Sequence, residues 1–205
     1  MLLAIDTSAG TSVAVVDREA GILADLLQPD TRRHAEVIGT MIREALDRSG
    51  IAVTDLSGVA VGMGPGPFTG LRVGIAAARA FALGIGRPVV PVVSHDAVAF
   101  GVTDSVLVVT DARRREVYWS TYSGIDDVGL PIRAAGPGLS APDNLESTVP
   151  DFGAFRRVDA DTVSAASLGV VAELRYLHGR PFASSEALYL RSPDVTLSAG
   201  PKRVS

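Results

Sequence analysis

Short apolar runs separated by turn residues open the chain. Residues 2–5, 12–16 and 22–27 are each dominated by aliphatic side chains, and glycine and charged residues lie between them. Runs of this length bounded by turn residues are typical of β-strands. Three such strands in succession favour an antiparallel meander at the start of the fold.

A helix is predicted next, over residues 31–49. Its apolar positions recur at the spacing of a helix face, and they are Ile38, Met41, Ile42, Ala45 and Leu46. Asp30 or Thr31 is the expected N-cap, since both side chains can accept a hydrogen bond from a free backbone N–H. Gly50 is the expected stop, because glycine readily takes the left-handed conformation that ends helices.

Strands and helices then alternate. Residues 59–61 and 89–93 predict buried strands, and a helix of small residues lies between them. Ser94 is expected to cap a short helix over residues 95–100. This alternation is the pattern of an α/β fold.

The second half of the chain restarts with strands, at residues 106–110 and 116–122. Residues 123–150 are rich in glycine and proline, which predicts loops with short edge strands. Ser164 is expected to cap a last helix that runs to about His178.

The restart after residues 101–105 predicts two α/β lobes. We assign residues 1–102 to an N-terminal lobe and residues 103–205 to a shortened C-terminal lobe. Each half begins with a strand that ends in an aspartate followed by small residues, at Asp6 and at Asp111. This echo is consistent with a duplicated fold.

A glycine- and proline-rich loop at residues 62–70 is the most distinctive segment. Its glycines permit close backbone approach and its prolines fix φ, so the loop is stiff. A glycine loop that enters a helix N-terminus can bind phosphate. However, Pro65 and Pro67 have no N–H to donate, and no Lys-Ser/Thr pair follows. The loop is therefore not a P-loop, and a structural or partner-docking role is favoured over a phosphate site.

The helix after this loop carries a stripe of small residues every four positions, namely Gly70, Gly74, Ala78, Ala82 and Gly86. Positions four apart share a helix face, and small side chains let a neighbouring element approach closely. The stripe fits either packing against the chain's own sheet or a seam with another subunit. Arg72 and Arg79 interrupt the apolar run, which argues against a membrane span.

Composition limits the function classes. The chain has 205 residues, 47% of them hydrophobic and 20% charged, with a net charge of −4 and no cysteine. A net negative chain is unsuited to broad electrostatic capture of nucleic acid, and thiolate chemistry is excluded. Residues 2–5 are too short an apolar run for a secretory signal, so we expect a cytoplasmic protein that is not bound to a membrane.

Catalytic motifs are sparse. The three histidines, His34, His95 and His178, form no pair at helical spacing, so we expect no metal site. A Gly-x-Ser-x-Gly nucleophile elbow is also missing from the sequence. The arginine run Arg113–Arg115, with Arg32 and Arg33, could touch RNA phosphate, although a solvated turn is the favoured interpretation.

Nucleotide binding remains open at the two strand ends. Asp6 and Asp111 could orient a nucleotide, and Thr7, Ser8 and Gly10 could form a phosphate-binding turn. The competing interpretation is that both aspartates stabilise turns. This second interpretation is favoured, because no adenosine-binding Gly-Gly motif follows.

Several segments together resemble one family. They are Ala4-Ile5-Asp6-Thr7-Ser8, Arg32-Arg33-His34-Ala35-Glu36, the run from Gly64 to Gly74, Asp111-Ala112-Arg113 with Glu116 to Trp119, and Leu188-Tyr189-Leu190-Arg191. In this order they resemble the TsaB (YeaZ) family, over most of the chain. Pro67 departs from the family, which more often has serine there, and the segment near residues 150–157 matches poorly.

The resemblance implies a two-lobed actin/Hsp70-like (ASKHA) fold in which each lobe is a mixed sheet flanked by helices. It also implies a non-catalytic subunit that binds and activates TsaD. With TsaE and ATP, that assembly threonylcarbamoylates the adenosine beside the anticodon of tRNAs that read ANN codons. The chain itself is then expected to hold no cofactor and to meet tRNA only indirectly.

The resemblance further implies that TsaD docks on the helices over residues 31–49 and 69–83, and that a homodimer uses the same surface when TsaD is absent. The interface residues expected on this basis are His34, Ile38, Met41, Gly70, Gly74, Ala78 and Ala82. Two alternatives are a small actin-like ATPase or kinase that uses Asp6 and Asp111, and a glycoprotease of the M22 type. The lack of a histidine pair and of a nucleophile weighs against the glycoprotease.

Overall fold

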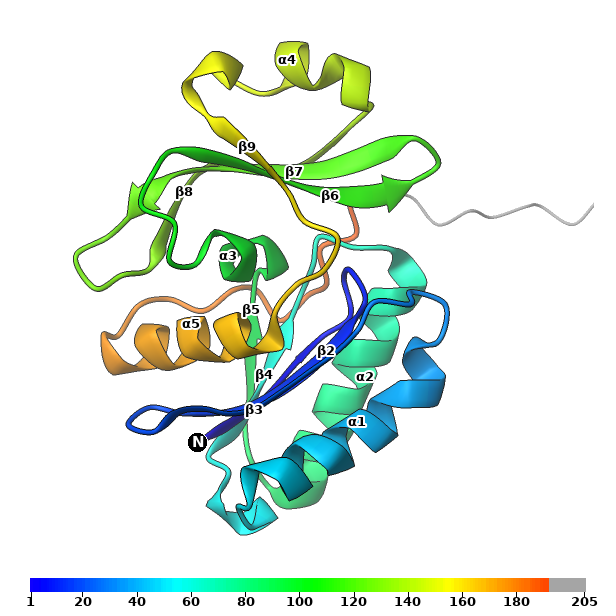
Figure 1. The fold of residues 1–205 in the computed structure, drawn as a ribbon, viewed down its shortest axis with the longest axis vertical. Helices are drawn as coiled ribbons and strands as arrows, with labels where there is room; N and C mark the ends of the chain where they lie inside the picture. Colours follow the sequence, from blue (N-terminus) through cyan, green and yellow to red (C-terminus); the bar gives the residue numbers. More distant parts are fainter. Residues whose placement is uncertain (192–205) are drawn as a thin grey trace, which may run out of the picture.

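A five-stranded sheet forms the first half of the molecule in the computed structural model, which describes residues 1–191 (Figure 1). Its strand order is β3-β2-β1-β4-β5. The first three strands pair antiparallel, which confirms the meander, and β4 and β5 add parallel to β1. The strands are β1 Leu2–Asp6, β2 Thr11–Asp17, β3 Gly21–Gln28, β4 Gly58–Gly62 and β5 Val89–Val92.

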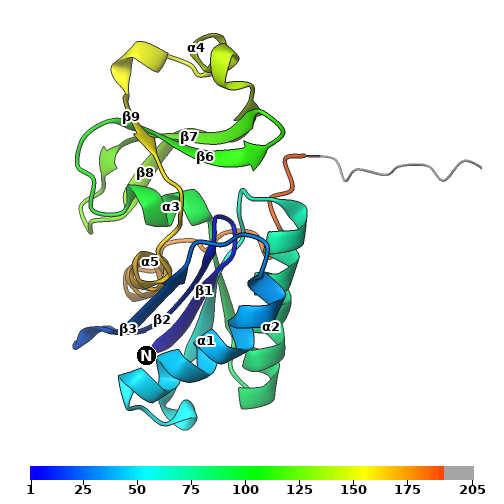
Figure 2. The same cartoon turned by 45° about the vertical axis from the view of Figure 1, so that its right-hand side comes forward.

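Helices cover both faces of this sheet. Helices α1 (His34–Ser49) and α2 (Phe68–Ile85) lie side by side on one face, and α5 (Ala165–Leu177) lies on the other (Figure 2). Successive side chains of a strand point to opposite faces. Leu3 and Ile5 of β1 accordingly pack in the core with α1 and α2, and Leu2 and Ala4 pack in the core with α5.

A four-stranded mixed sheet forms the second half, in the order β8-β7-β6-β9. Its strands are β6 Val106–Arg113, β7 Glu116–Ile125, β8 Pro131–Ser140 and β9 Arg156–Asp159. The short helix α4 (Leu145–Thr148) and two 3₁₀ turns, Pro142–Asn144 and Phe152–Ala154, cover its outer face.

Strand β8 corrects one prediction. Residues 131–140 were expected to be loop with short edge strands, and they form a ten-residue edge strand along β7. Three shifts of register interrupt the pairing of β7 with β8. Glycine and proline are tolerated at an edge strand of this kind because its outer backbone groups need no partner.

Helix α3 (Ser94–Ala99) connects the two sheets and lies between them (Figure 1). The chain then builds the second sheet and returns, so that α5 packs on β1 and β2 of the first sheet. Gly169 of α5 makes this close contact possible, since a Cβ there would lie 2.7 Å from a methyl carbon of Val16. The division of the chain near residue 102 stays a prediction.

Two of the four expected helix signals are wrong. The N-cap of α1 is Arg33, without a side-chain cap, rather than Asp30 or Thr31. Ser94 lies inside α3, and its hydroxyl bonds to Asp6 instead of the helix end. Gly50 does end α1 in the left-handed conformation, and the Ser164 side chain does cap α5 by accepting from Ser167 N–H; these two are confirmed.

Candidate functional site

Asp6 is the last residue of β1, and its buried carboxylate is hydrogen-bonded within the chain. Its Oδ1 accepts from the backbone N–H of Ser8 at 2.8 Å and from the Ser8 hydroxyl at 2.5 Å. Its Oδ2 accepts from the hydroxyl of Ser94 at 2.6 Å. Burial raises the pKa of the Asp6 carboxyl, and the hydrogen bonds from Ser8 and Ser94 counteract part of that rise.

The glycine-proline loop packs directly on the turn that follows Asp6. A Cβ on Gly66 would lie 2.8 Å from the Cα of Ser8, and the Thr7 hydroxyl donates to the carbonyl of Gly70 at 2.7 Å. Gly10 takes a φ of 77° beside the carbonyl of Gln28. The loop therefore packs closely against Thr7 and Ser8, and the expected phosphate-binding role of this turn stays a prediction.

Asp111 is not brought together with Asp6. It lies exposed on β6, where its Oδ1 accepts from the backbone N–H of Arg113 at 2.8 Å and its Oδ2 pairs with the Arg113 guanidinium at 3.4 Å. Asp6 is buried with both carboxylate oxygens bonded, whereas Asp111 stabilises a turn.

The stripe of small residues faces the interior. Gly70, Gly74, Ala78 and Ala82 are all buried against the first sheet and α1. A Cβ on Gly74 would lie 2.1 Å from the hydroxyl oxygen of Thr7. Close packing within the chain thus explains the stripe.

The expected interface residues of α1 are also buried. His34, Ile38 and Met41 lie on the inner face of α1, and the His34 Nδ1 lies 2.8 Å from the hydroxyl of Thr11. Burial, together with the charge of Arg113, lowers the pKa of His34. All seven residues expected at a docking seam are therefore buried against their own chain; their part in a docking seam stays a prediction.

The outer face of α1 and α2, which points away from the first sheet, is exposed and carries one glycine on each helix. Gly39 of α1 and Gly84 of α2 are exposed, and a Cβ on either residue would meet nothing within 4 Å. Leu83 is 84% exposed beside Gly84. A cavity of about 600 Å³ is lined mainly by α1, including Gly39 and Ile42, and by residues 51–53 after it, with Phe81 from α2.

This outer face is the part of the candidate site that the pattern analysis missed. Glycine inside a helix lowers stability by about 1 kcal/mol relative to alanine, and packing within the chain does not explain Gly39 or Gly84. The sequence signal that could have indicated this face is the presence of Gly39 and Gly84 away from the apolar positions of their helices.

Of the helices in residues 1–191, α2 is the one with the length and apolar composition to cross a membrane. Its small-residue stripe packs on the sheet, and Arg72 and Arg79 are exposed on its other side. Helix α2 therefore packs on the first sheet along one face and is exposed along the other.

A segment near the end of the described chain bridges the two sheets. The N–H of Leu188 donates to the carbonyl of Met63 at 2.8 Å, and the ring of Tyr189 lies 4.8 Å from that of Phe68. Arg191 pairs with Glu116 of β7 at 3.0 Å. A cavity of about 440 Å³ lies between these side chains, the start of α2 and the β6–β7 turn.

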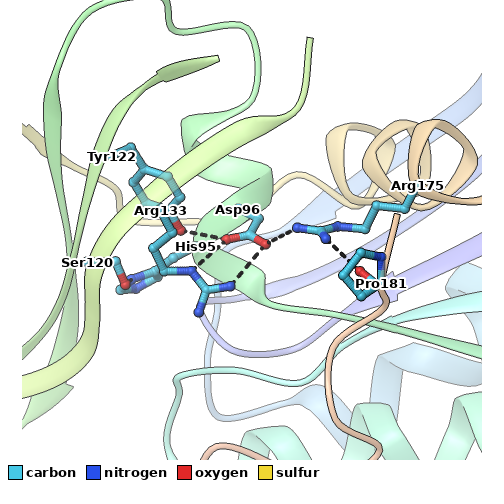
Figure 3. A network of polar contacts seen from close by, with 7 residues as sticks. All are labelled: His95, Asp96, Ser120, Tyr122, Arg133, Arg175 and Pro181. Carbon is cyan, nitrogen blue, oxygen red and sulfur yellow. Dashed lines mark hydrogen bonds and ion pairs between the residues drawn. The ribbon is translucent and has the colours of Figure 1, made fainter. Parts of the chain in front are cut away.

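Asp96 of α3 forms a second bridge, which the sequence did not indicate (Figure 3). Its Oδ1 accepts from the Tyr122 hydroxyl at 2.8 Å and from Arg133 Nε at 3.2 Å, and its Oδ2 accepts from Arg175 at 2.9 Å. Tyr122 lies on β7, Arg133 on β8 and Arg175 on α5. One buried carboxylate therefore holds three elements around α3.

His95 next to it is fully buried and bonds to the hydroxyls of Ser120 at 2.8 Å and Thr110 at 2.9 Å. Burial lowers the pKa of His95 to about 3, with a smaller effect from the charge of Arg133. The imidazole is therefore neutral at physiological pH and acts as a structural link between α3 and the second sheet.

Comparison of the sequence and the fold with known proteins indicates the class of protein to which the chain belongs. The family model described as "TsaD: tRNA N6-adenosine threonylcarbamoyltransferase" matches residues 21–148, more than half of the chain. Two solved structures from Pseudomonas aeruginosa resemble this fold over almost the whole chain. The one described as YeaZ has a TM-score of 0.72 and 26% identity, over 90% of this chain and 96% of that chain. The other, described as similar to peptidase YeaZ, has a TM-score of 0.73 over 93% and 99%. The two-lobed actin-like fold is confirmed.

Relatives identified by sequence similarity indicate the family more specifically. The uncharacterized protein Rv3421c of Mycobacterium tuberculosis is 39% identical over 198 residues, which cover 95% of this chain and 93% of that protein. The tRNA threonylcarbamoyladenosine biosynthesis protein TsaB of Escherichia coli is 36% identical over 127 residues, or 59% of this chain and 54% of TsaB. The chain belongs to the TsaB (YeaZ) family of tRNA threonylcarbamoyladenosine biosynthesis proteins.

Proposed function

We propose that this chain is a non-catalytic subunit that binds a TsaD-type enzyme and activates it for N6-threonylcarbamoylation of tRNA. The relatives named TsaB support the pathway. The observation that carries the docking role is the outer face of α1 and α2, where Gly39 and Gly84 leave open space on exposed helices. Such glycines let a helix of a partner approach closely.

The partner in this proposal is the TsaD-type enzyme itself. The match of residues 21–148 to the TsaD family model indicates that the two proteins share a fold, so their helices can pair in a related way. In the same proposal TsaE and ATP complete the assembly in the cytoplasm, and a homodimer forms through the same helices when TsaD is absent.

The state of Asp6 supports a non-catalytic role. Its two oxygens are bonded to Ser8 and Ser94, and the glycine-proline loop fills the adjacent turn. A stand-alone kinase needs an open carboxylate that can orient a metal and a nucleophile. The geometry therefore favours the subunit over the actin-like kinase alternative.

Substitution of the two exposed glycines tests the docking role. Gly39→Arg and Gly84→Arg place a long side chain in open space and raise helix propensity, so both variants are expected to fold. They are expected to abolish co-elution with the TsaD of the same organism, measured by size exclusion with light scattering. Gly153→Arg, at an equally open glycine of the second half, is the matched control and is expected to pair normally. Normal pairing by the Gly39 and Gly84 variants would refute this interface.

A further inference from the structure

The turn between β6 and β7 has an unusual backbone. Arg113, Arg114 and Arg115 all have positive φ, at 67°, 52° and 62°. This left-handed conformation is unfavourable for any residue with a Cβ, whereas glycine adopts it freely. Three consecutive arginines are thus held where glycine would fold more easily, and strain of this kind is concentrated at functional sites.

More cationic side chains adjoin this turn. The Arg113 guanidinium donates to the hydroxyl of Thr31, which brings Arg32 and Arg33 beside it. Arg32, Arg114 and Arg115 are all exposed. Within residues 1–191, the side chains of Arg32 and Arg115 make no ion pair or hydrogen bond.

The carboxylates nearby are mostly engaged. Asp111 pairs with Arg113, Glu36 pairs with Arg33, and Glu116 pairs with Arg191; Asp30 lies before Thr31. Arginines outnumber carboxylates around the turn, although the whole chain carries a net charge of −4. The positive charge is therefore concentrated locally.

Aromatic rings lie next to these cations. Phe68 and Tyr189 line the cavity of about 440 Å³ that Arg113 and Arg114 also line. The Arg72 guanidinium lies 3.9 Å from the centre of the Phe68 ring. Guanidinium groups recognise phosphate through paired hydrogen bonds, and aromatic rings beside them stack with unpaired bases. The combination fits RNA better than an acidic protein.

We propose that the turn at Arg113–Arg115, together with Arg32, is an RNA contact surface that binds backbone phosphates of the tRNA. The cavity beside it can receive a nucleotide base from an unpaired region. The inference rests on the proposed function for its choice of RNA, and it replaces the expectation that tRNA is met only indirectly.

The test removes the charge without disturbing the turn. Arg114→Gly/Arg115→Gly deletes two cations and relieves the backbone, so this variant is expected to fold at least as well as the wild type. Arg114→Lys/Arg115→Lys keeps the charge. Arg18→Ala removes an exposed cation at the far end of β2. Binding of a fluorescent, unmodified tRNA transcript to the complex with TsaD is measured by anisotropy over a range of salt concentrations.

The glycine variant is expected to bind tRNA about tenfold more weakly at moderate salt. The slope of log affinity against log salt is expected to become shallower by roughly one for each phosphate that the variant no longer neutralises. The lysine variant is expected to recover most of the affinity, and Arg18→Ala is expected to match the wild type.

Unchanged affinity and salt slope in the glycine variant would overturn the proposal. Loss of TsaD pairing instead of tRNA binding would also overturn it, because the turn would then be a protein contact. If the wild type fails to pair with TsaD, the proposed function fails. The same titration with this chain alone then decides whether the turn binds RNA.

Discussion

The hydroxyl oxygen of Thr7 lies only 2.1 Å from the position that a Cβ on Gly74 would occupy. The strand end and the helix are therefore in contact through bare backbone at Gly74. The Thr7 hydroxyl also donates to the carbonyl of Gly70 one turn earlier. This contact fixes α2, and with it the glycine-proline loop, against the end of β1.

Gly74→Ala is expected to destabilise the protein by about 1–3 kcal/mol, because the added methyl group overpacks a buried contact. The measurement is urea unfolding followed by circular dichroism. Thr7→Gly in the same chain is expected to recover part of the loss by removing the clashing side chain. Gly84→Ala is the matched control and is expected to stabilise by about 0.5–1 kcal/mol, since alanine has the higher helix propensity and its methyl group would meet no neighbouring atom there. Equal effects of the two alanine substitutions would contradict this packing.

Asp96 is expected to dominate the link between the two sheets. Asp96→Ala leaves the guanidinium groups of Arg133 and Arg175 without their carboxylate, and breaking a buried ion pair in this way costs about 3–5 kcal/mol. The expected result is a large drop in melting temperature, with faster hydrogen exchange in β8 and α5 than in β1.

Asp104→Ala removes an exposed carboxylate from the same connection between the sheets and is expected to change little. A small effect of Asp96→Ala, comparable with that of Asp104→Ala, would show that the three donors find other partners.

The pattern of the sequence predicts elements that local contacts determine. The meander of β1 to β3, the stop at Gly50 and the cap at Ser164 all follow from neighbouring residues. Strand β8 was missed because glycine and proline signal a loop unless a neighbouring strand pairs with them. That pairing with β7 is a tertiary effect.

The candidate site was harder to predict, for two physical reasons. Helical spacing shows that Gly74 and Ala78 share a face, but it does not show whether the chain's own sheet or a partner covers that face. The bridge at Asp96 joins side chains up to 79 positions apart in sequence. No local pattern indicates that Arg133 and Arg175 meet one carboxylate.

The neutral imidazole of His95 predicts a pH dependence of stability. Burial lowers its pKa from 6.5 to about 3 in the folded protein. Between these values the unfolded chain binds a proton that the folded protein does not, so stability falls as pH falls through this window. The slope attributable to this residue approaches about 1.4 kcal/mol per pH unit.

The raised pKa of Asp6 has the opposite effect on stability. Between the unfolded pKa of 3.8 and the higher folded pKa, the folded protein holds a proton that the unfolded chain has released, so this carboxyl makes the protein more stable as pH falls through that window. His95→Gln isolates the histidine. Urea unfolding at pH 7, 6 and 5 is expected to show a steeper loss of stability in the wild type than in this variant. Parallel curves for the two proteins would contradict the assignment.

Ala78 and Ala80 separate the inner and outer faces of α2. Ala78 is fully buried against the first sheet, whereas Ala80 is exposed on the same helix. Ala78→Arg forces a charge into an apolar core and is expected to destabilise by roughly 3 kcal/mol or more. Ala80→Arg is expected to leave the melting temperature within a few degrees of the wild type. Ala80 lies four positions before Gly84 and so shares its helix face, which is the proposed docking face. This second variant is therefore expected to weaken pairing with TsaD, measured by light scattering of the mixed proteins. A folded Ala80→Arg variant that pairs normally would move the interface away from α2, and a stable Ala78→Arg variant would contradict the burial of the stripe.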